Sequence, residues 1–225
     1  LDISDIDLDR FVLTASEMTE RVHAYGSKMF LQLSMGFGRV LAPALAKKPP
    51  VSASAVPNFW DPSVTCRAMT IKEIEFVIRK FGEAAAIAKR AGFDGVEIHA
   101  VHEGYLLDQF TTAFTNHRTD KFGGDLRGRT TLPVAIVKEV KGTVGKDFPV
   151  VLRFSIKSCV KGFNSGGLEG EDYQEFGRDA DEGYTIAPWF EEAGYDAFDA
   201  DEGSYDAWYF AHPPVYQRHG LYLDH

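Results

Sequence analysis

"AGFDGVEIH", residues 91–99, is the stretch that decides the fold, because its pattern recurs as "AGYDAFDAD" at residues 193–201. Each copy passes from the end of a helix-like segment, through Ala-Gly-aromatic-Asp, into a run typical of a β-strand. Two copies of one helix-to-strand junction indicate repeated βα units. The sequence therefore predicts a parallel sheet whose strands are joined by helical crossovers.

Helix and strand candidates alternate on both sides of these junctions. Apolar spacing predicts helices over residues 8–25 and around 106–110. A further helix begins at a capping box of Thr70 and Glu73 and ends at Gly92. Two more are predicted over 130–140, with Pro133 in the first turn, and over 171–193, with a restart at Pro188. Strands are expected at 28–35, 94–100, 148–155 and 196–204. Residues 40–69, rich in Pro, Ala and Ser, read as a long loop.

Each predicted strand has one apolar face and one face that turns polar toward its C-terminal end. The polar positions are Gln32, Glu97, His99, Arg153, Asp199 and Asp201. Strands covered by helices on both faces would be apolar on both. Polar groups at strand C-termini favour a (β/α)8 TIM barrel over an open doubly wound sheet, and no glycine fingerprint for a dinucleotide follows any strand.

The predicted barrel is incomplete. About four βα units can be read, so its first and last strands are missing. The chain opens on "LDISDIDLDRF", without a methionine, and stops at "GLYLDH", so we expect an excerpt of a longer protein.

Composition restricts the partners. The 24 Lys and Arg against 33 Asp and Glu give a formal charge of -9, which argues against nucleic acid and anionic membranes as partners. The sequence has no apolar run of the ~18 residues that a membrane span needs, so we expect a cytoplasmic protein. Cys66 and Cys159 are far apart and suit two reduced thiols rather than a metal cluster.

Several motifs resemble one enzyme family. "FDGVEIHAVHEGYLLDQF" at 93–110, "TNHRTDKFGGDLRGR" at 115–129 and "FPVVLRFS" at 148–155 look like the old yellow enzyme family of flavin-dependent ene reductases. With "MFLQLSMGFGRV" and "SYDAWYFAHPPVY", the chain is most similar to the branch of 2-enoate reductases, 2,4-dienoyl-CoA reductases and bile-acid enone oxidoreductases. The resemblance implies that residues 1–225 are a single partial FMN-binding ene-reductase barrel domain.

The resemblance also implies roles for individual residues. Gln32 and Arg153 match residues that contact the flavin, His99 and His102 match the pair that binds the substrate carbonyl oxygen, and Tyr105 matches the tyrosine that protonates the α-carbon. Trp208 is expected on the substrate side of the cleft, with Tyr209 and Tyr216. Arg118, Asp120 and Arg129 are interpreted as an ion-paired structural loop.

The residues alone leave other interpretations open. Gln32 at a strand end can simply face water, and Tyr105 can serve only as a packed aromatic. His99 and His102 suit a metal pair that lacks a third ligand, or loop residues satisfied locally. An inward Arg153 requires a carboxylate partner, for which Glu97 and Asp199 are the candidates.

The functional hypothesis is an FMN-dependent ene reductase that moves hydride from NADH or NADPH, by way of the flavin, to an α,β-unsaturated acid, thioester or ketone. No metal site is expected in this chain, and the resemblance implies that the parent protein carries an iron–sulfur cluster and FAD elsewhere. The alternative is a truncated, non-catalytic fragment that binds no FMN, or that associates with a partner to complete the barrel. A flavin-free aldolase or isomerase is disfavoured, because Lys157 lies just beyond a strand rather than at its rim.

Overall fold

The computed structural model describes residues 7–46, 48–101, 105–158, 160, 170 and 172–205. The larger elements are the helices α1 (Leu8–His23), α2 (Ile71–Arg90), α3 (Leu106–Thr111), α4 (Leu126–Val144) and α5 (Ala180–Ala193), and the strands β1 (Phe30–Ser34), β4 (Gly95–Ala100), β5 (Val150–Lys157) and β6 (Ala197–Glu202). The predicted loop at 40–69 contains the short elements η2 (Gly38–Val40), η3 (Pro43–Leu45), β2 (Val51–Ser52) and β3 (Arg67–Ala68).

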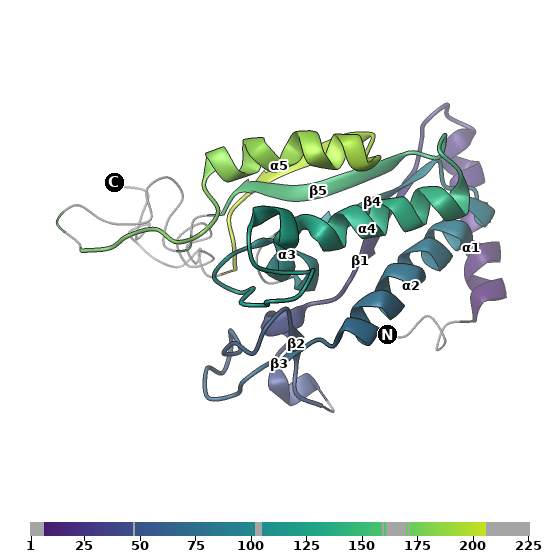
Figure 1. The fold of residues 1–225 in the computed structure, drawn as a ribbon. Coiled ribbons are helices and arrows are strands. Elements are labelled where there is room, and N and C mark those ends of the chain that lie inside the picture. The colour runs from purple at the N-terminus through teal and green to yellow at the C-terminus, as the bar shows by residue number, and fades with distance from the viewer. Residues whose placement is uncertain are drawn as a thin grey trace, which may run out of the picture.

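The order of the strands settles the architecture. The four long strands pair in parallel in the order β1-β4-β5-β6, so they are neighbours in the order in which the chain makes them. Helices α2, α4 and α5 lie side by side over one face of this sheet (Figure 1). A doubly wound sheet would reverse its strand order and carry helices on both faces. The prediction of an incomplete (β/α)8 barrel is confirmed.

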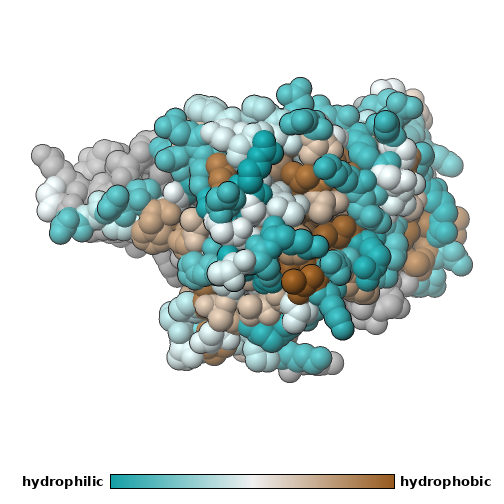
Figure 2. All heavy atoms as spheres, viewed as in Figure 1, coloured by the Kyte–Doolittle hydropathy of each residue, from teal (hydrophilic) through white to brown (hydrophobic). Residues whose placement is uncertain are grey.

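The two faces of the sheet differ as predicted. Val96, Ile98 and Leu152 are completely buried against the helices. On the other face Gln32 and Asp199 are exposed, and Arg153 is half-buried. In the view of Figure 2, the surface over the helices shows hydrophilic side chains with separate hydrophobic patches between them. The apolar core therefore lies between sheet and helices, while the polar strand positions share the opposite face.

Helix α2 begins at the predicted capping box. The Thr70 hydroxyl accepts a hydrogen bond from the Glu73 N–H, and the Glu73 carboxylate accepts one from the Thr70 N–H at 2.8 Å. Arg67 of β3 forms a salt bridge with the same carboxylate at 2.8 Å and lowers the pKa of Glu73 to about 2. The helix start is thereby joined to the end of the preceding long loop.

The repeated junction has the same structure in both copies. Asp94 donates its N–H to the Met29 carbonyl at 2.9 Å and accepts the Met29 N–H on its carboxylate at 2.8 Å. Asp196 makes the same pair of bonds with Val150, at 2.9 and 2.7 Å. We call each pair of bonds an Asp bracket. Each one joins the start of a strand to the start of the preceding neighbour in the sheet.

The residues around each bracket also correspond. Gly92 and Gly194 both have positive φ angles, of 83° and 122°, which a glycine adopts without strain. Phe93 and Tyr195 are both buried. A lysine contacts each aspartate as well, Lys28 at 2.9 Å and Lys141 at 2.6 Å. The predicted repeat is therefore a real structural repeat.

Two predictions about prolines are wrong. Pro133 lies inside α4 rather than in a first turn, because Asp125 caps the helix by accepting a hydrogen bond from the Gly128 N–H. Pro188 lies inside α5 and marks no restart. That helix begins at Ala180 behind its cap Asp179, so the predicted helix over 171–193 is too long at its N-terminal end.

Candidate functional site

His99 and Tyr105 meet at the C-terminal end of β4. His99 is 5% exposed and lies opposite Ser34 of β1 and Arg153 of β5 in the sheet register. Its ring centroid is 4.0 Å from that of Tyr105, with the ring planes at 57°. The structure therefore brings two of the predicted site residues into contact. His102 and Trp208, together with Tyr209 and Tyr216, lie outside the described residues.

The segment after β1 packs against Tyr105. Tyr105 is the N-terminal cap residue of α3, and its ring centroid lies 5.7 Å from that of Phe37. The Gln109 side chain of α3 accepts the Arg39 N–H at 3.1 Å and donates to the Phe37 carbonyl at 3.3 Å. A side chain at Gly38 would collide with Gln109, and Gly38 also has a φ of 58°. This glycine allows the segment and α3 to approach closely enough to place Tyr105.

Gln32 and Arg153 lie on the polar face of the sheet. Gln32 donates a hydrogen bond to the Glu97 carboxylate at 2.5 Å. Arg153 binds the carboxylates of Asp201 at 2.7 Å and Asp199 at 3.3 Å. Asp199 is therefore confirmed as a partner of Arg153. Glu97 is not, because it pairs with Gln32 on the neighbouring strand, and the nearer partner Asp201 was not predicted.

This face offers an amide, carboxylates and one guanidinium along neighbouring strands. The amide both donates and accepts hydrogen bonds, while the guanidinium donates only. Such a set suits a planar ligand whose polar edge carries donors and acceptors and takes on negative charge.

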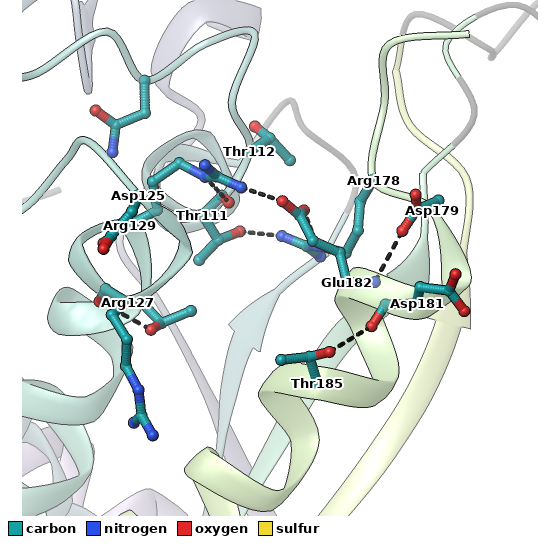
Figure 3. A network of polar contacts seen from close by, with 12 residues as sticks. Thr111, Thr112, Asp125, Arg127, Arg129, Arg178, Asp179, Asp181, Glu182 and Thr185 are labelled. Atoms are coloured by element: carbon teal, nitrogen blue, oxygen red, sulfur yellow. Dashed lines mark hydrogen bonds and ion pairs between the residues drawn. The ribbon is translucent and has the colours of Figure 1, made fainter.

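A network of charged residues joins α3 to α4 and α5 (Figure 3). Glu182 of α5 lies between Arg129 of α4 and Arg178 and forms ion pairs with both. Arg129 also donates to the Thr111 carbonyl at the end of α3, at 3.0 Å. The α3 residue Asp108 lies 3.5 Å from Arg178, and both side chains are 1% exposed. We call this network the α3 anchor.

The predicted structural loop is confirmed in part. Arg118 binds Asp120 at 2.6 Å, donates to the carbonyls of Ala53 and Met69, and lowers the pKa of Asp120. Arg129, in contrast, belongs to helix α4 and to the α3 anchor rather than to this loop.

Three residues near the site were missed by the sequence analysis, namely Asp108, Arg178 and Tyr205. Arg178 and Asp108 are 70 residues apart and belong to no local motif, so only the fold shows that they meet. Asp201 was placed with Asp199 on the polar face of a predicted strand, but not as the partner of Arg153. Tyr205 lies just beyond that strand and contacts Tyr105 with a centroid distance of 6.2 Å.

A groove runs along the free edge of β1, away from the His99–Tyr105 contact. It has a volume of about 440 Å³ and is lined mainly by apolar side chains of β1, α1 and α2, including Leu31, Leu33, Phe11 and Phe76. Within the described ranges, no group of three or more His, Cys, Asp or Glu side chains could hold a metal ion. None of the described helices is long and apolar enough to cross a membrane.

Comparison with known proteins gives consistent matches. The model of the NADH:flavin oxidoreductase / NADH oxidase family matches residues 9–175. Cinnamate reductase of Clostridium sporogenes is 56% identical over 213 residues, which are 95% of this chain and 32% of the relative. NADH oxidase of Thermoanaerobacter brockii is 37% identical over 203 residues, 90% of this chain and 29% of the relative. The chain thus spans about a third of these curated relatives.

Two solved structures are similar to the fold. A complex of 2-naphthoyl-CoA reductase with 2-naphthoyl-CoA matches with a TM-score of 0.70 and 28% identity, over 87% of this chain and 29% of the other. The old yellow enzyme homologue from Zymomonas mobilis matches with a TM-score of 0.65 and 28% identity, over 86% and 53%.

Proposed function

Because the chain belongs to the NADH:flavin oxidoreductase / NADH oxidase family, we propose that it is the central part of an FMN-dependent ene reductase. The reaction is reduction of the C=C bond of an α,β-unsaturated acid, thioester or ketone, with NADH or NADPH as the source of hydride. The identity of 56% to a cinnamate reductase supports an enoate among these substrates. The observation that carries the proposal is the contact of His99 with Tyr105 at the end of β4.

The donor set on the polar face fits a flavin. Gln32 would bind the pyrimidine edge of FMN, which presents both donors and acceptors. Arg153 would lie near the same ring, where a fixed positive charge favours the reduced, anionic form. Asp201 and Asp199 hold the Arg153 guanidinium in place through bonds of 2.7 and 3.3 Å.

Substrate activation is assigned to His99 and His102. Bound FMN supplies the hydride that reaches the β-carbon. As that bond forms, negative charge develops on the conjugated carbonyl oxygen, and imidazole N–H donors stabilise it. The burial of His99 strengthens such a hydrogen bond, because water competes less for the oxygen.

Tyr105 is assigned the protonation of the α-carbon, the step that completes the reduction of the C=C bond. Its O–H bond breaks, the proton forms the new C–H bond at the α-carbon, and the electron pair stays on the phenol oxygen. A phenol remains protonated at neutral pH and can regain its proton from water, which suits a general acid. Trp208 is proposed to shape the substrate side of the cleft.

We propose further that residues 1–225 form a single, partial barrel domain. In the described part of the chain, β1 and β6 each pair with one neighbour, so the sheet has two open edges. The second candidate function, a fragment that binds no FMN by itself or completes its barrel with a partner, follows from these edges. A cytoplasmic location remains a prediction.

The Tyr105→Phe variant tests the catalytic assignment. In protein kept saturated with added FMN, we expect flavin reduction by NADH or NADPH to be unchanged, because no protein acid is needed there. Reoxidation by an enoate such as cinnamate should slow by about 10²-fold or more, because the general acid is lost. Stopped-flow absorbance of the flavin follows both half-reactions. Equal slowing of both would contradict the assignment.

A matched control is Tyr184→Phe, in an exposed tyrosine of α5. This substitution removes the same hydroxyl group from a side chain that faces solvent, and it should change neither half-reaction.

A further inference from the structure

Tyr205 is a second aromatic neighbour of the proposed proton donor, besides Phe37. It lies three residues after the end of β6, and its ring centroid is 6.2 Å from that of Tyr105, with the ring planes at 54°. On its other side the Phe59 ring packs against it at 5.8 Å. Tyr205 is thus held between the long loop at 40–69 and Tyr105.

The backbone before Tyr205 is fixed to β5. The Gly203 N–H donates to the Lys157 carbonyl at 3.1 Å, and the Ser155 hydroxyl lies 3.2 Å from the Gly203 carbonyl oxygen, to which it donates. Ser204 is 4% exposed. These contacts place the Tyr205 ring by the fold itself, before any ligand is bound.

The hydroxyl groups of the two tyrosines are hydrogen-bonded to each other. Partial burial is the main cause that raises the pKa of Tyr205, and the neighbouring charge and hydrogen bond of Tyr105 raise it further. Once Tyr105 has given up its proton, its oxygen can only accept a hydrogen bond. The Tyr205 hydroxyl, which still carries a hydrogen, is then the donor of the pair.

We propose that Tyr205 is a positioning residue for proton transfer, whose hydroxyl donates a hydrogen bond to the Tyr105 oxygen and stabilises the phenolate left after the α-carbon has been protonated. The inference rests on the proposed role of Tyr105 as general acid. Hydrogen bonds to an ionised acceptor are about twice as strong as those between neutral groups. The Tyr205 contact therefore strengthens as Tyr105 gives up its proton, which is the change a transition state needs.

Other groups with a charge or a proton to exchange also face this pair. His99 of β4 packs on Tyr105 at 4.0 Å, and Arg39 lies 5.7 Å from the Phe59 ring, on the ring that contacts Tyr205. A positive charge on either would favour the Tyr105 phenolate as well. The Tyr205 effect must therefore be measured as a difference between variants that keep His99 and Arg39.

The first test measures the ionisation of Tyr105 without any reaction. The full chain is labelled with [¹³Cζ]tyrosine, and the Tyr105 resonance is identified by its loss in Tyr105→Phe. In Tyr205→Phe, which keeps the ring and its contact with Phe59, the midpoint of the Tyr105 titration should rise by about one pH unit. Tyr184→Phe should leave it in place. An unchanged midpoint in Tyr205→Phe would overturn the inference.

The second test uses the protein loaded with FMN. Tyr205→Phe should slow flavin reoxidation by the enoate about tenfold and leave flavin reduction by the nicotinamide unchanged, a split that general loosening of the site would not produce. Unchanged reoxidation would also overturn the inference. Failure of the proposed function itself looks different, because Tyr105→Phe would then reoxidise at the wild-type rate whatever the titration of Tyr105 shows.

Discussion

Arg178 and Asp108 are the most buried charged pair among the ion pairs described. Each of these two charges is tolerated inside the protein because the other compensates it. Both side chains are 1% exposed, and Arg178 donates further hydrogen bonds to the Ser155 carbonyl at 2.5 Å and to the Thr111 hydroxyl. Removal of one member of a buried pair leaves the other charge without compensation. The pair is therefore expected to be costly to break, whatever its net contribution when intact.

Arg178→Met should lower the free energy of unfolding by about 3–5 kcal/mol, because it leaves the Asp108 carboxylate buried without its positively charged partner. Urea denaturation followed by circular dichroism measures this change. Arg79→Met, in an exposed arginine of α2, is the matched control and should stay within about 0.5 kcal/mol of the unsubstituted chain. A similar small loss in both variants would show that the α3 anchor contributes little.

At this scale the sequence predicts some site residues and misses others for a physical reason. His99 and Tyr105 follow one strand closely, so a local motif contains both, and the fold brings their rings together. Arg178 and Tyr205 reach the site from later units of the chain. Their neighbours are determined by contacts between distant parts of the chain, which no local pattern contains.

The two Asp brackets show how far a pattern can predict an element. The pattern Ala-Gly-aromatic-Asp predicted two equivalent helix-to-strand junctions, and both have the same hydrogen bonds. Helix boundaries near proline were predicted less well. Pro133 and Pro188 suggested starts, but the caps at Asp125 and Asp179 lie several residues earlier and determine where α4 and α5 begin.

The Asp94 bracket should make stability depend on pH. Burial alone would raise the pKa of Asp94, but hydrogen bonds from Lys28, the Met29 N–H and His23 together hold it well below its usual range. A carboxyl whose pKa is lower in the folded state stabilises the protein above its unfolded pKa of about 3.9. This contribution is lost as the pH falls through the folded-state pKa.

Asp94→Asn should therefore lower the free energy of unfolding most above about pH 5, and the difference from the unsubstituted chain should shrink below about pH 4. Urea denaturation across this range measures it. Asp147→Asn, in an exposed aspartate of the turn before β5, should show a small difference that does not vary with pH. If the difference for Asp94→Asn does not vary with pH, the negative charge of the Asp94 carboxylate does not contribute to the stability that the Asp bracket provides.

The described part of the chain is a four-stranded parallel sheet with helices on one face and exposed polar side chains on the other. Gln32 and Asp199 are exposed there, although the corresponding face of a closed barrel is interior. The barrel could be predicted from the polar strand ends, and sequential strand order confirms it. The apolar groove along β1 could not be predicted, because it is formed by side chains of β1, α1 and α2 that only the fold brings together.

The isolated chain should therefore hold FMN weakly. After incubation with FMN and desalting, we expect a colourless protein, since an uncovered sheet face lets water compete for the flavin contacts of Gln32 and Arg153. A longer protein that joins this chain to the remaining strands of a barrel should keep a visible flavin spectrum. Retention of flavin by the 225-residue chain alone would show that four units suffice.

The Asp brackets also have a consequence for the order of folding. The first one joins residues 65 positions apart and the second one residues 46 apart, and each closes a single helical crossover between two neighbouring strands. Contacts with modest separation in sequence form faster than those between distant parts of a chain. A new strand can thus form the hydrogen bonds of its Asp bracket with the preceding strand as soon as its aspartate has been synthesised. We expect such a sheet to grow in one direction, strand by strand, as the ribosome releases it.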